Sequence, residues 1–317
     1  MNNEEVKMDL QRRQLTQISF LYYEKNLTQQ EISKMTGLSR IKVSRLLQKA
    51  KDSGVVKITV DYSGSFLELE HKIIAKYKLK DVIIVDDNID TNAKNMVASA
   101  AAYYLENNLT DKCTVAVGWG TTLRLIQEHI HPINKKILFS QIIGGHGKHQ
   151  FDLHASTIAS SLAKQTGCDS LSLLAPAFAQ TSIDKEILLN DNVIQEVLTA
   201  SAKAEFALFS LGNPLILESS IKKSGYFSDQ DISLLHAENA LCDVVSILFL
   251  NDKGQPCCEN ITNRSIGIKA EELKKIQTKI CVIEGEAKQV TVKIALEAGF
   301  IDVLILDNKM AEYLLEN

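Results

Sequence analysis

The chain has 317 residues, 45% of them hydrophobic, and a formal net charge of −4 at pH 7. This hydrophobic share excludes a disordered chain, and the length exceeds what one hydrophobic core comfortably supports, so we expect two domains. No apolar run reaches the length of a membrane span, and acids stand where a secretory signal would have its apolar core. We therefore expect a cytoplasmic protein that contacts no membrane.

Charge is distributed unevenly along the chain. Residues 1–60 contain eleven Lys or Arg and six Asp or Glu, a net charge of +5, which leaves −9 for residues 61–317. A basic segment joined to an acidic one indicates that only the basic segment meets a polyanion. We therefore predict separate domains at 1–60 and 61–317.

The basic segment carries the signals of three helices. Apolar residues at helical spacing predict the first helix within 8–24. Thr28 and Glu31 have the spacing of a capping box, which predicts the start of the second helix after Thr28. Ser39 is a typical N-cap for the third helix, which we expect to end near Gly54.

Two short helices joined by a glycine-bearing turn are typical of a helix-turn-helix, and the run VVKITV after Gly54 predicts a strand that completes a winged variant. Polar side chains on the outward face of the third helix can reach phosphates and base edges in a major groove. The alternative is an ordinary solvated helix, but cap, turn, core spacing and basic face coincide. The predicted DNA-binding residues are Thr28, Gln29, Ser39, Arg40, Lys42, Ser44, Arg45, Gln48 and Lys49.

The acidic segment alternates between β-rich and helix-like stretches. After a connecting helix predicted within 62–77, this alternation predicts a Rossmann-like α/β domain with a mainly parallel sheet. The predicted strands are DVIIV at 81–85, CTVAV at 113–117, ILFSQII at 137–143, SLSLL at 170–174, FALFSLG at 206–212, VVSILFL at 244–250, KICVIEG at 279–285 and DVLIL at 302–306.

Three glycine-rich loops, GWGTT at 118–122, IGGHG at 143–147 and LGNP at 211–214, follow predicted strands. Ligands of such sheets collect beyond the carboxyl ends of the strands. The first loop runs directly into a helix, so its amides and threonine hydroxyls can bind an anion such as phosphate, although it is neither a Walker loop nor a GxGxxG fingerprint. Lys288, at another strand-to-helix junction, can meet the same phosphate. The alternative is that Lys288 is an ordinary solvated lysine on the surface.

Cysteine and histidine spacings predict no metal site and no cofactor. The six cysteines include no CxxC pair and are expected to be buried thiols. The neighbours Cys257 and Cys258 are expected to be an incidental pair in a loop, with a redox switch as the alternative. His146, His149 and His154 match no zinc pattern, and the first two can instead contact ligand hydroxyls.

Taken together, these segments resemble the SorC family of sugar-binding transcriptional regulators, which pair a helix-turn-helix with an effector domain similar to sugar-phosphate isomerases and deaminases. With this resemblance we expect a repressor of a carbohydrate-utilisation operon whose operator binding is controlled by a phosphorylated sugar bound to residues 61–317. We expect a homodimer or homotetramer, because one helix-turn-helix reads only a few base pairs and two on half-sites multiply the affinity. It is carried by residues 27–56, VGWGTTL at 117–123, the glycine pair at 144–145, SGYFS at 224–228, CDVVSILFLNDKG at 242–254, NRSIGI at 263–268 and EGEAK at 284–288.

The resemblance also implies roles for particular residues. Residues 118–122 and Lys288 would bind the effector phosphate, while Asp243 would accept hydrogen bonds from sugar hydroxyls. The glycine pair at 144–145 would line the sugar. Ile143 stands where some family members have a lysine that forms a Schiff base, so we expect non-covalent binding. The implied effector-binding residues are Gly118, Trp119, Gly120, Thr121, Thr122, Gly144, Gly145, His146, Gly212, Asp243 and Lys288.

Two other functions stay open at this point. One is an enzyme, a sugar-phosphate isomerase or deaminase with a DNA-binding head. No general base with an evident partner is recognisable in the acidic segment, so we predict no enzyme activity. The other is a DNA-binding protein whose acidic segment is a dimerisation module with a vestigial pocket.

Overall fold

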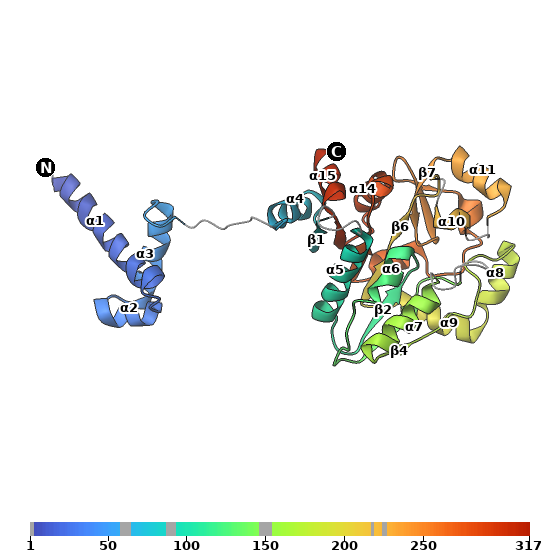
Figure 1. The fold of residues 1–317 in the computed structure, drawn as a ribbon, viewed down its shortest axis with the longest axis horizontal. Helices are drawn as coiled ribbons and strands as arrows, with labels where there is room; N and C mark the ends of the chain where they lie inside the picture. The colour runs from blue at the N-terminus through green and yellow to red at the C-terminus, as the bar shows by residue number, and fades with distance from the viewer. Residues whose placement is uncertain (1–2, 58–64, 87–92, 146–153, 217–218, 224–226) are drawn as a thin grey trace. The chain divides into compact units, whose positions relative to one another are not determined.

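The computed structural model describes residues 3–57, 65–86, 93–145, 154–216, 219–223 and 227–317 (Figure 1). By its internal contacts the chain divides into two compact units, Met1–Ser63 and Gly64–Asn317. Among the described residues, no helix combines the length and the apolar character needed to cross a bilayer.

The first unit is helical where it is described. Its core consists of Ile18, Ile32, Val43 and Leu47, one or two from each helix. The predicted first helix is observed as α1 and a π-helical turn. The helical elements are α1 (Asn3–Ser19), η1 (Phe20–Glu24), α2 (Gln29–Thr36) and α3 (Arg40–Asp52). The predicted strand VVKITV extends over residues 58–60, which lie outside the described residues, so the winged variant stays a prediction.

Local hydrogen bonds explain where α2 and α3 begin. The Thr28 hydroxyl accepts from the Glu31 N–H at 3.3 Å, and the Glu31 carboxylate accepts from the Thr28 N–H at 2.8 Å, which confirms the predicted capping box. Gly37, with a φ of 68°, ends α2 in the left-handed region that favours glycine. The Ser39 hydroxyl then accepts from the Lys42 N–H and starts α3.

The second unit contains a seven-stranded sheet whose paired strands are all parallel, in the order β1-β11-β10-β5-β2-β3-β4. This confirms the prediction of a mainly parallel sheet. Its strands are β1 (Asp81–Val85), β2 (Cys113–Val117), β3 (Ile137–Gln141), β4 (Asp169–Ser170), β5 (Phe206–Phe209), β10 (Thr278–Val282) and β11 (Val303–Asp307).

Both faces of this sheet are buried, since a hydrophobic core lies on each side of it. Successive side chains of a strand belong to one core and the other in turn. Val303 and Ile305 belong to one core, whereas Leu304 and Leu306 belong to the other. The first core contains side chains of α5 (Ala93–Asn108), α6 (Thr121–Ile126) and α7 (Ala155–Thr166). The second contains side chains of α4 (Leu67–Tyr77), α14 (Gln289–Glu297) and α15 (Asn308–Glu316).

A second, antiparallel sheet that was not predicted packs into the second core, in the order β6-β7-β8-β9. Its strands are β6 (Leu211–Gly212), β7 (Ala240–Val244), β8 (Leu248–Asn251) and β9 (Pro256–Cys257). The remaining helices are α8 (Ser182–Leu189), α9 (Asn192–Ala202), α10 (Ser220–Lys223), α11 (Asp229–Ala237), α12 (Glu259–Thr262), α13 (Ala270–Lys275) and the 3-10 turn η3 (Glu286–Lys288).

Five predicted strands were wrong in their extent by two residues or more. The runs 137–143 and 279–285 are too long, because β3 ends at Gln141 and β10 ends at Val282. The run 244–250 is two strands, because Val245 and Ser246 have φ values of 53° and 58° and turn the chain between β7 and β8. The run 206–212 is also divided, since β5 belongs to the parallel sheet and β6 to the antiparallel one. The run 170–174 leaves the sheet after Ser170.

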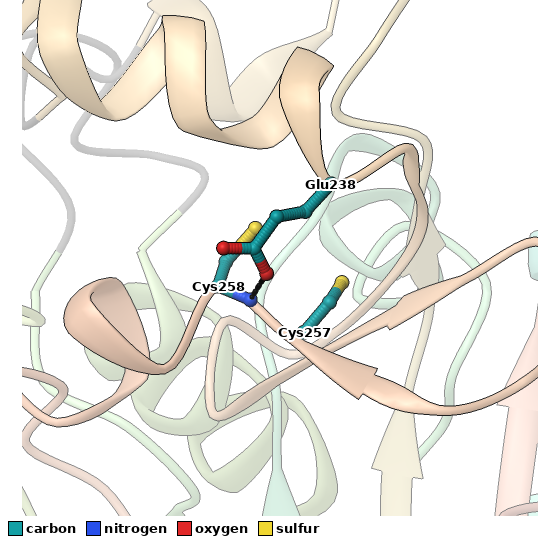
Figure 2. Close-up of side chains that lie close together, drawn as sticks. All are labelled: Glu238, Cys257 and Cys258. Carbon is teal, nitrogen blue, oxygen red and sulfur yellow. Dashed lines mark hydrogen bonds between the residues drawn. The ribbon is translucent and has the colours of Figure 1, made fainter.

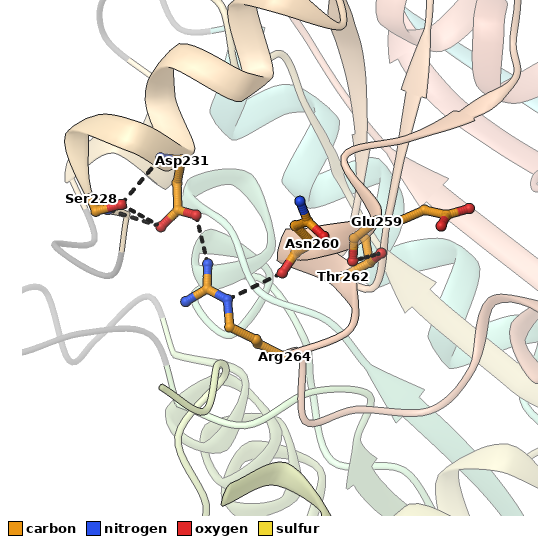
Figure 3. A network of polar contacts seen from close by, with 6 residues as sticks. All are labelled: Ser228, Asp231, Glu259, Asn260, Thr262 and Arg264. Carbon is orange, nitrogen blue, oxygen red and sulfur yellow. Dashed lines mark hydrogen bonds and ion pairs between the residues drawn. The ribbon is translucent and has the colours of Figure 1, made fainter. Parts of the chain in front are cut away.

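Two segments on which the family resemblance rests meet at α11. The Asp231 carboxylate accepts from the Ser228 N–H and hydroxyl, both at 3.0 Å, and lies 2.7 Å from the Arg264 guanidinium (Figure 3). Arg264 also donates to the Asn260 carbonyl of α12 at 3.2 Å. These bonds tie the start of α11 to the segment after α12.

Candidate functional site

A cavity of about 340 Å³ opens at the carboxyl ends of β2, β5 and β10 and borders the antiparallel sheet. This is the edge at which parallel α/β sheets bind ligands. The polar and glycine residues that line it are Lys94, Gly120, Thr121, Ser210, Gly212, Asn213, Ser219, Asp243, Glu284, Gly285 and Lys288. Trp119 and Val245 are among its apolar lining residues.

The GWGTT loop has an inner and an outer part. A β-carbon at Gly118 would lie 3.1 Å from side-chain atoms of both Phe209 and Val245, so this glycine lets the loop pack closely against β5 and the β7–β8 turn. Gly120 has a φ of 144°, which a residue with a side chain rarely adopts. Trp119, Gly120 and Thr121 line the cavity, whereas Gly118 and Thr122 are not among its lining residues.

Two lysines and a glutamate give the cavity its charged wall. Lys288, at the end of η3, is half-buried, and burial lowers its pKa while the Glu284 carboxylate opposes that effect. Lys94, at the start of α5, lies 3.4 Å from Glu284 Oε1, and the Thr122 hydroxyl donates to the same oxygen at 3.5 Å. An anion beside Lys288 would offset the cost of its burial, so this wall is suited to a phosphate.

Asp243 is the buried carboxyl of the site, with 3% of its surface exposed. Burial raises its pKa to about 7, although hydrogen bonds from the backbone N–H and the hydroxyl of Ser246 lower it. Gly212 lies opposite Asp243 in the β6–β7 pair. A ligand hydroxyl that donates to this carboxyl would favour its charged form.

Ser210 is a cavity residue that the sequence analysis missed. The residue is 8% exposed, and its hydroxyl has no hydrogen-bond partner among the described residues. A buried hydroxyl in this state carries a desolvation cost that a polar ligand group can remove. A polar residue between the apolar residues Phe209 and Leu211, at a strand end, is the signal that could have found it. Lys94, Asn213 and Glu284 were also missed.

Gly144 and Gly145, which were expected to line the sugar, are not among the residues that line the cavity. A β-carbon at Gly144 would lie 2.3 Å from the Pro176 carbonyl oxygen, so the close approach of two backbone segments explains this glycine. Gly145 exchanges backbone hydrogen bonds with Ala175 and Ala177. The predicted ligand contacts His146 and His149 lie outside the described residues, and His154 is the buried N-cap of α7.

The predicted DNA-binding residues gather around α3. Its inner face contributes Val43, Leu47 and Ala50 to the interior of the helical unit. The polar residues that are exposed are Thr28, Ser39, Arg40, Lys42, Ser44, Arg45, Gln48 and Lys49, while Gln29 is partly buried. A shallow hollow beside the start of α3 is lined by Tyr22, Thr28, Gln29 and Arg40, among others. Thr28 and Ser39 are also N-caps, so each has a structural role as well.

Comparisons with known proteins agree with this division of the chain. Residues 62–316 match the Sugar-bind family model, a sugar-binding domain, and residues 8–63 match the MarR_2 model of the MarR family. The deoxyribonucleoside regulator of Bacillus subtilis is 28% identical over 98% of this chain and 100% of its own length. The sorbitol operon regulator of Klebsiella pneumoniae is 23% identical over 96% of this chain and 98% of its own.

Two solved structures are similar over most of the chain. Full-length SorC from Klebsiella pneumoniae has a TM-score of 0.75 at 23% identity and covers 96% of this chain and 99% of its own. A DeoR family transcriptional regulator from Listeria monocytogenes has a TM-score of 0.71 at 30% identity and covers 78% of this chain and 98% of its own. The likeness to full-length SorC shows that the two chains share a fold.

Proposed function

The chain belongs to the SorC family of sugar-binding transcriptional regulators, and from that premise we propose that its cavity binds a phosphorylated sugar that controls operator binding. The observation that carries the proposal is the meeting of Lys288, Thr121 and Asp243 in one cavity. A cation and hydrogen-bond donors suit the phosphate, and a buried carboxyl suits adjacent sugar hydroxyls.

The proposed regulatory action is repression of a carbohydrate-utilisation operon in the cytoplasm. The exposed face of α3 binds operator DNA through Arg40, Lys42 and Arg45 in particular, and the sugar phosphate favours a state that fits the operator less well. A ligand shifts such an equilibrium only through its different affinities for the two states. The sugar binds reversibly, since Ile143 cannot form a Schiff base, and it is not converted.

A homodimer or homotetramer is part of the proposal, because one helix-turn-helix reads few base pairs and two on adjacent half-sites multiply the affinity. Exposed apolar side chains on α8 support contact with a second copy of this chain. Ile183 and Ile187 are four residues apart on that helix and are 67% and 65% exposed. Spacing of four places both on one face of the helix.

Titration of the protein–operator complex with a panel of phosphorylated pentoses, hexoses and tetritols tests this function. We expect one of them to release operator DNA and to raise the Tm. At a concentration of 100 times its Kd, the ligand should add about 2.7 kcal/mol to the free energy of unfolding. The unphosphorylated sugar is the control. A panel that changes neither property would favour the vestigial pocket, and turnover of the sugar phosphate would favour the enzyme.

A further inference from the structure

Three potential metal ligands meet where α11 ends beside β9, outside the cavity. They are Glu238, the C-cap of α11, and the neighbours Cys257 and Cys258. The two sulfur atoms and a carboxylate oxygen all lie within 4.8 Å of one another. Figure 2 shows both cysteine side chains extending toward the side from which Glu238 approaches. This pair was expected in a loop, whereas Cys257 ends β9 and Cys258 is the N-cap of α12.

Hydrogen bonds of Glu238 and Cys258 orient the group. The Cys258 backbone N–H donates to Glu238 Oε2 at 2.6 Å, which orients the carboxylate beside the two thiols. The Cys258 thiol donates to the Leu234 carbonyl oxygen at 3.9 Å, a contact that metal binding would replace. Both thiols are buried, whereas Glu238 is exposed, so the group is reached from solvent at the carboxylate.

The backbone that carries these ligands is fixed at both ends. The Asp231–Arg264 pair ties the start of α11 to the segment after α12 (Figure 3). The Glu238–Cys258 bond ties the end of α11 to the segment before α12. Such a scaffold holds the three side chains near one another before any ion binds, which limits the entropy lost on binding.

We propose that Glu238, Cys257 and Cys258 bind a thiophilic divalent metal ion of the Zn²⁺ class. Zn–S bonds of about 2.3 Å and Zn–O bonds of about 2.0–2.2 Å in a tetrahedral site imply ligand separations of roughly 3.4–3.8 Å. Separations within 4.8 Å therefore need contractions of at most about 1.4 Å. Two thiolates select against Mg²⁺ and Ca²⁺, and three protein ligands leave the fourth position to water.

The test is titration of the reduced, chelator-treated full-length protein with ZnCl₂, in competition with a chromophoric chelator. We expect one ion per chain, and with Co²⁺ we expect thiolate-to-metal charge-transfer absorption. MgCl₂ is expected not to compete. An absence of binding, or binding without the thiolate absorption, would overturn the proposal.

Variants assign the ligands. Cys257→Ser and Cys258→Ser should each weaken Zn²⁺ binding at least about 100-fold, since even the loss of an outer partner of a ligand costs 10- to 100-fold. Glu238→Gln keeps an oxygen for the Cys258 N–H, so it should fold normally and still lose about 10-fold or more in affinity. Cys168→Ser, at a half-buried cysteine outside the group, is the matched control and should bind as the parent does. If Glu238→Gln and the Cys257→Ser, Cys258→Ser double variant both bind Zn²⁺ as tightly as the parent protein does, the proposed site is contradicted.

Discussion

Gly212 faces Asp243 across the β6–β7 pair, and a β-carbon at position 212 would lie 3.4 Å from Asp243 Oδ2. The glycine leaves the cavity side of that carboxylate oxygen uncovered. A methyl group fits there with little strain, because 3.4 Å is close to ordinary van der Waals contact, but it occupies space that a ligand hydroxyl needs.

Gly212→Ala should therefore weaken sugar-phosphate binding at least about 10-fold, the effect of losing a hydrogen bond of about 1.4 kcal/mol to a charged group, and leave the Tm nearly unchanged. Calorimetric titration and a thermal melt measure the two quantities. Gly254→Ala, at a positive φ in the β8–β9 turn, is a control that should lower stability and leave affinity alone. An unchanged Kd in Gly212→Ala would remove Asp243 Oδ2 from the proposed site.

The pKa of Asp243, raised by burial to about 7, makes the stability of the free protein depend on pH. Below its ordinary value of 3.8, both folded and unfolded states hold the proton, so there is no difference. As the pH rises from there to about 7, the unfolded state loses the proton first, and stability falls by up to roughly 4 kcal/mol. Asp243→Asn should thus raise the Tm at pH 8 relative to the parent, and not at pH 3.5.

Effector binding should respond to pH in the opposite direction. The charged carboxylate accepts hydrogen bonds from sugar hydroxyls, so affinity should increase between pH 6 and 8 as Asp243 loses its proton. The sugar phosphate also titrates near pH 6. Asp243→Asn shares that second titration, and the difference between the two profiles isolates the carboxyl. Parallel profiles would show that Asp243 does not sense the ligand.

Ser210 has a hydroxyl without a hydrogen-bond partner among the described residues, so its substitution removes no such bond from the free protein. Ser210→Ala removes a buried, unpaired hydroxyl, so it should leave the Tm unchanged or raise it slightly. If the ligand pairs with this hydroxyl, affinity should fall about 2- to 10-fold, the value of one neutral hydrogen bond. A lower Tm with the same Kd would assign Ser210 to the fold instead.

The parts of the molecule that local chemistry determines were predictable from the sequence. The capping box of Thr28 and Glu31 spans four residues, and the strands of the parallel sheet are continuous apolar runs because both of their faces are buried. The turn at Val245 was not predictable, since a β-branched residue rarely adopts a positive φ. Nor was the meeting of Glu238 with Cys258, which depends on how α11 packs beside β9.

Lys288 and Arg45 should separate the two binding activities. Lys288→Ala removes one of the two lysine cations of the cavity wall, so sugar-phosphate affinity should fall at least about 10-fold, in the range of hydrogen bonds to charged groups, while operator affinity in the absence of ligand stays the same. Arg45→Ala should do the reverse and reduce the slope of log K against log salt by about 1 if it contacts a phosphate. Lys253→Ala, at an exposed turn, is the control for both.

The measurements are fluorescence anisotropy with labelled operator DNA at several salt concentrations, and calorimetry with the sugar phosphate. Because the two substitutions lie in different compact units, each should leave the other activity intact. Loss of both activities in either variant, together with a lower Tm, would indicate misfolding. Loss of both at an unchanged Tm would contradict the assignment of DNA binding and effector binding to separate units.

The apolar face of α8 should decide the oligomeric state. Ile183→Glu and Ile187→Glu each place a charge on an exposed position, so neither should lower the stability of an isolated chain by more than about 0.5 kcal/mol. In an interface between copies the same charges would be buried without a partner, and the assembly should dissociate to smaller species. Tyr103→Glu, at an exposed aromatic on α5, is the matched control. Sedimentation velocity gives the mass, and an unchanged mass in the Ile183→Glu, Ile187→Glu double variant would place the contact between copies elsewhere.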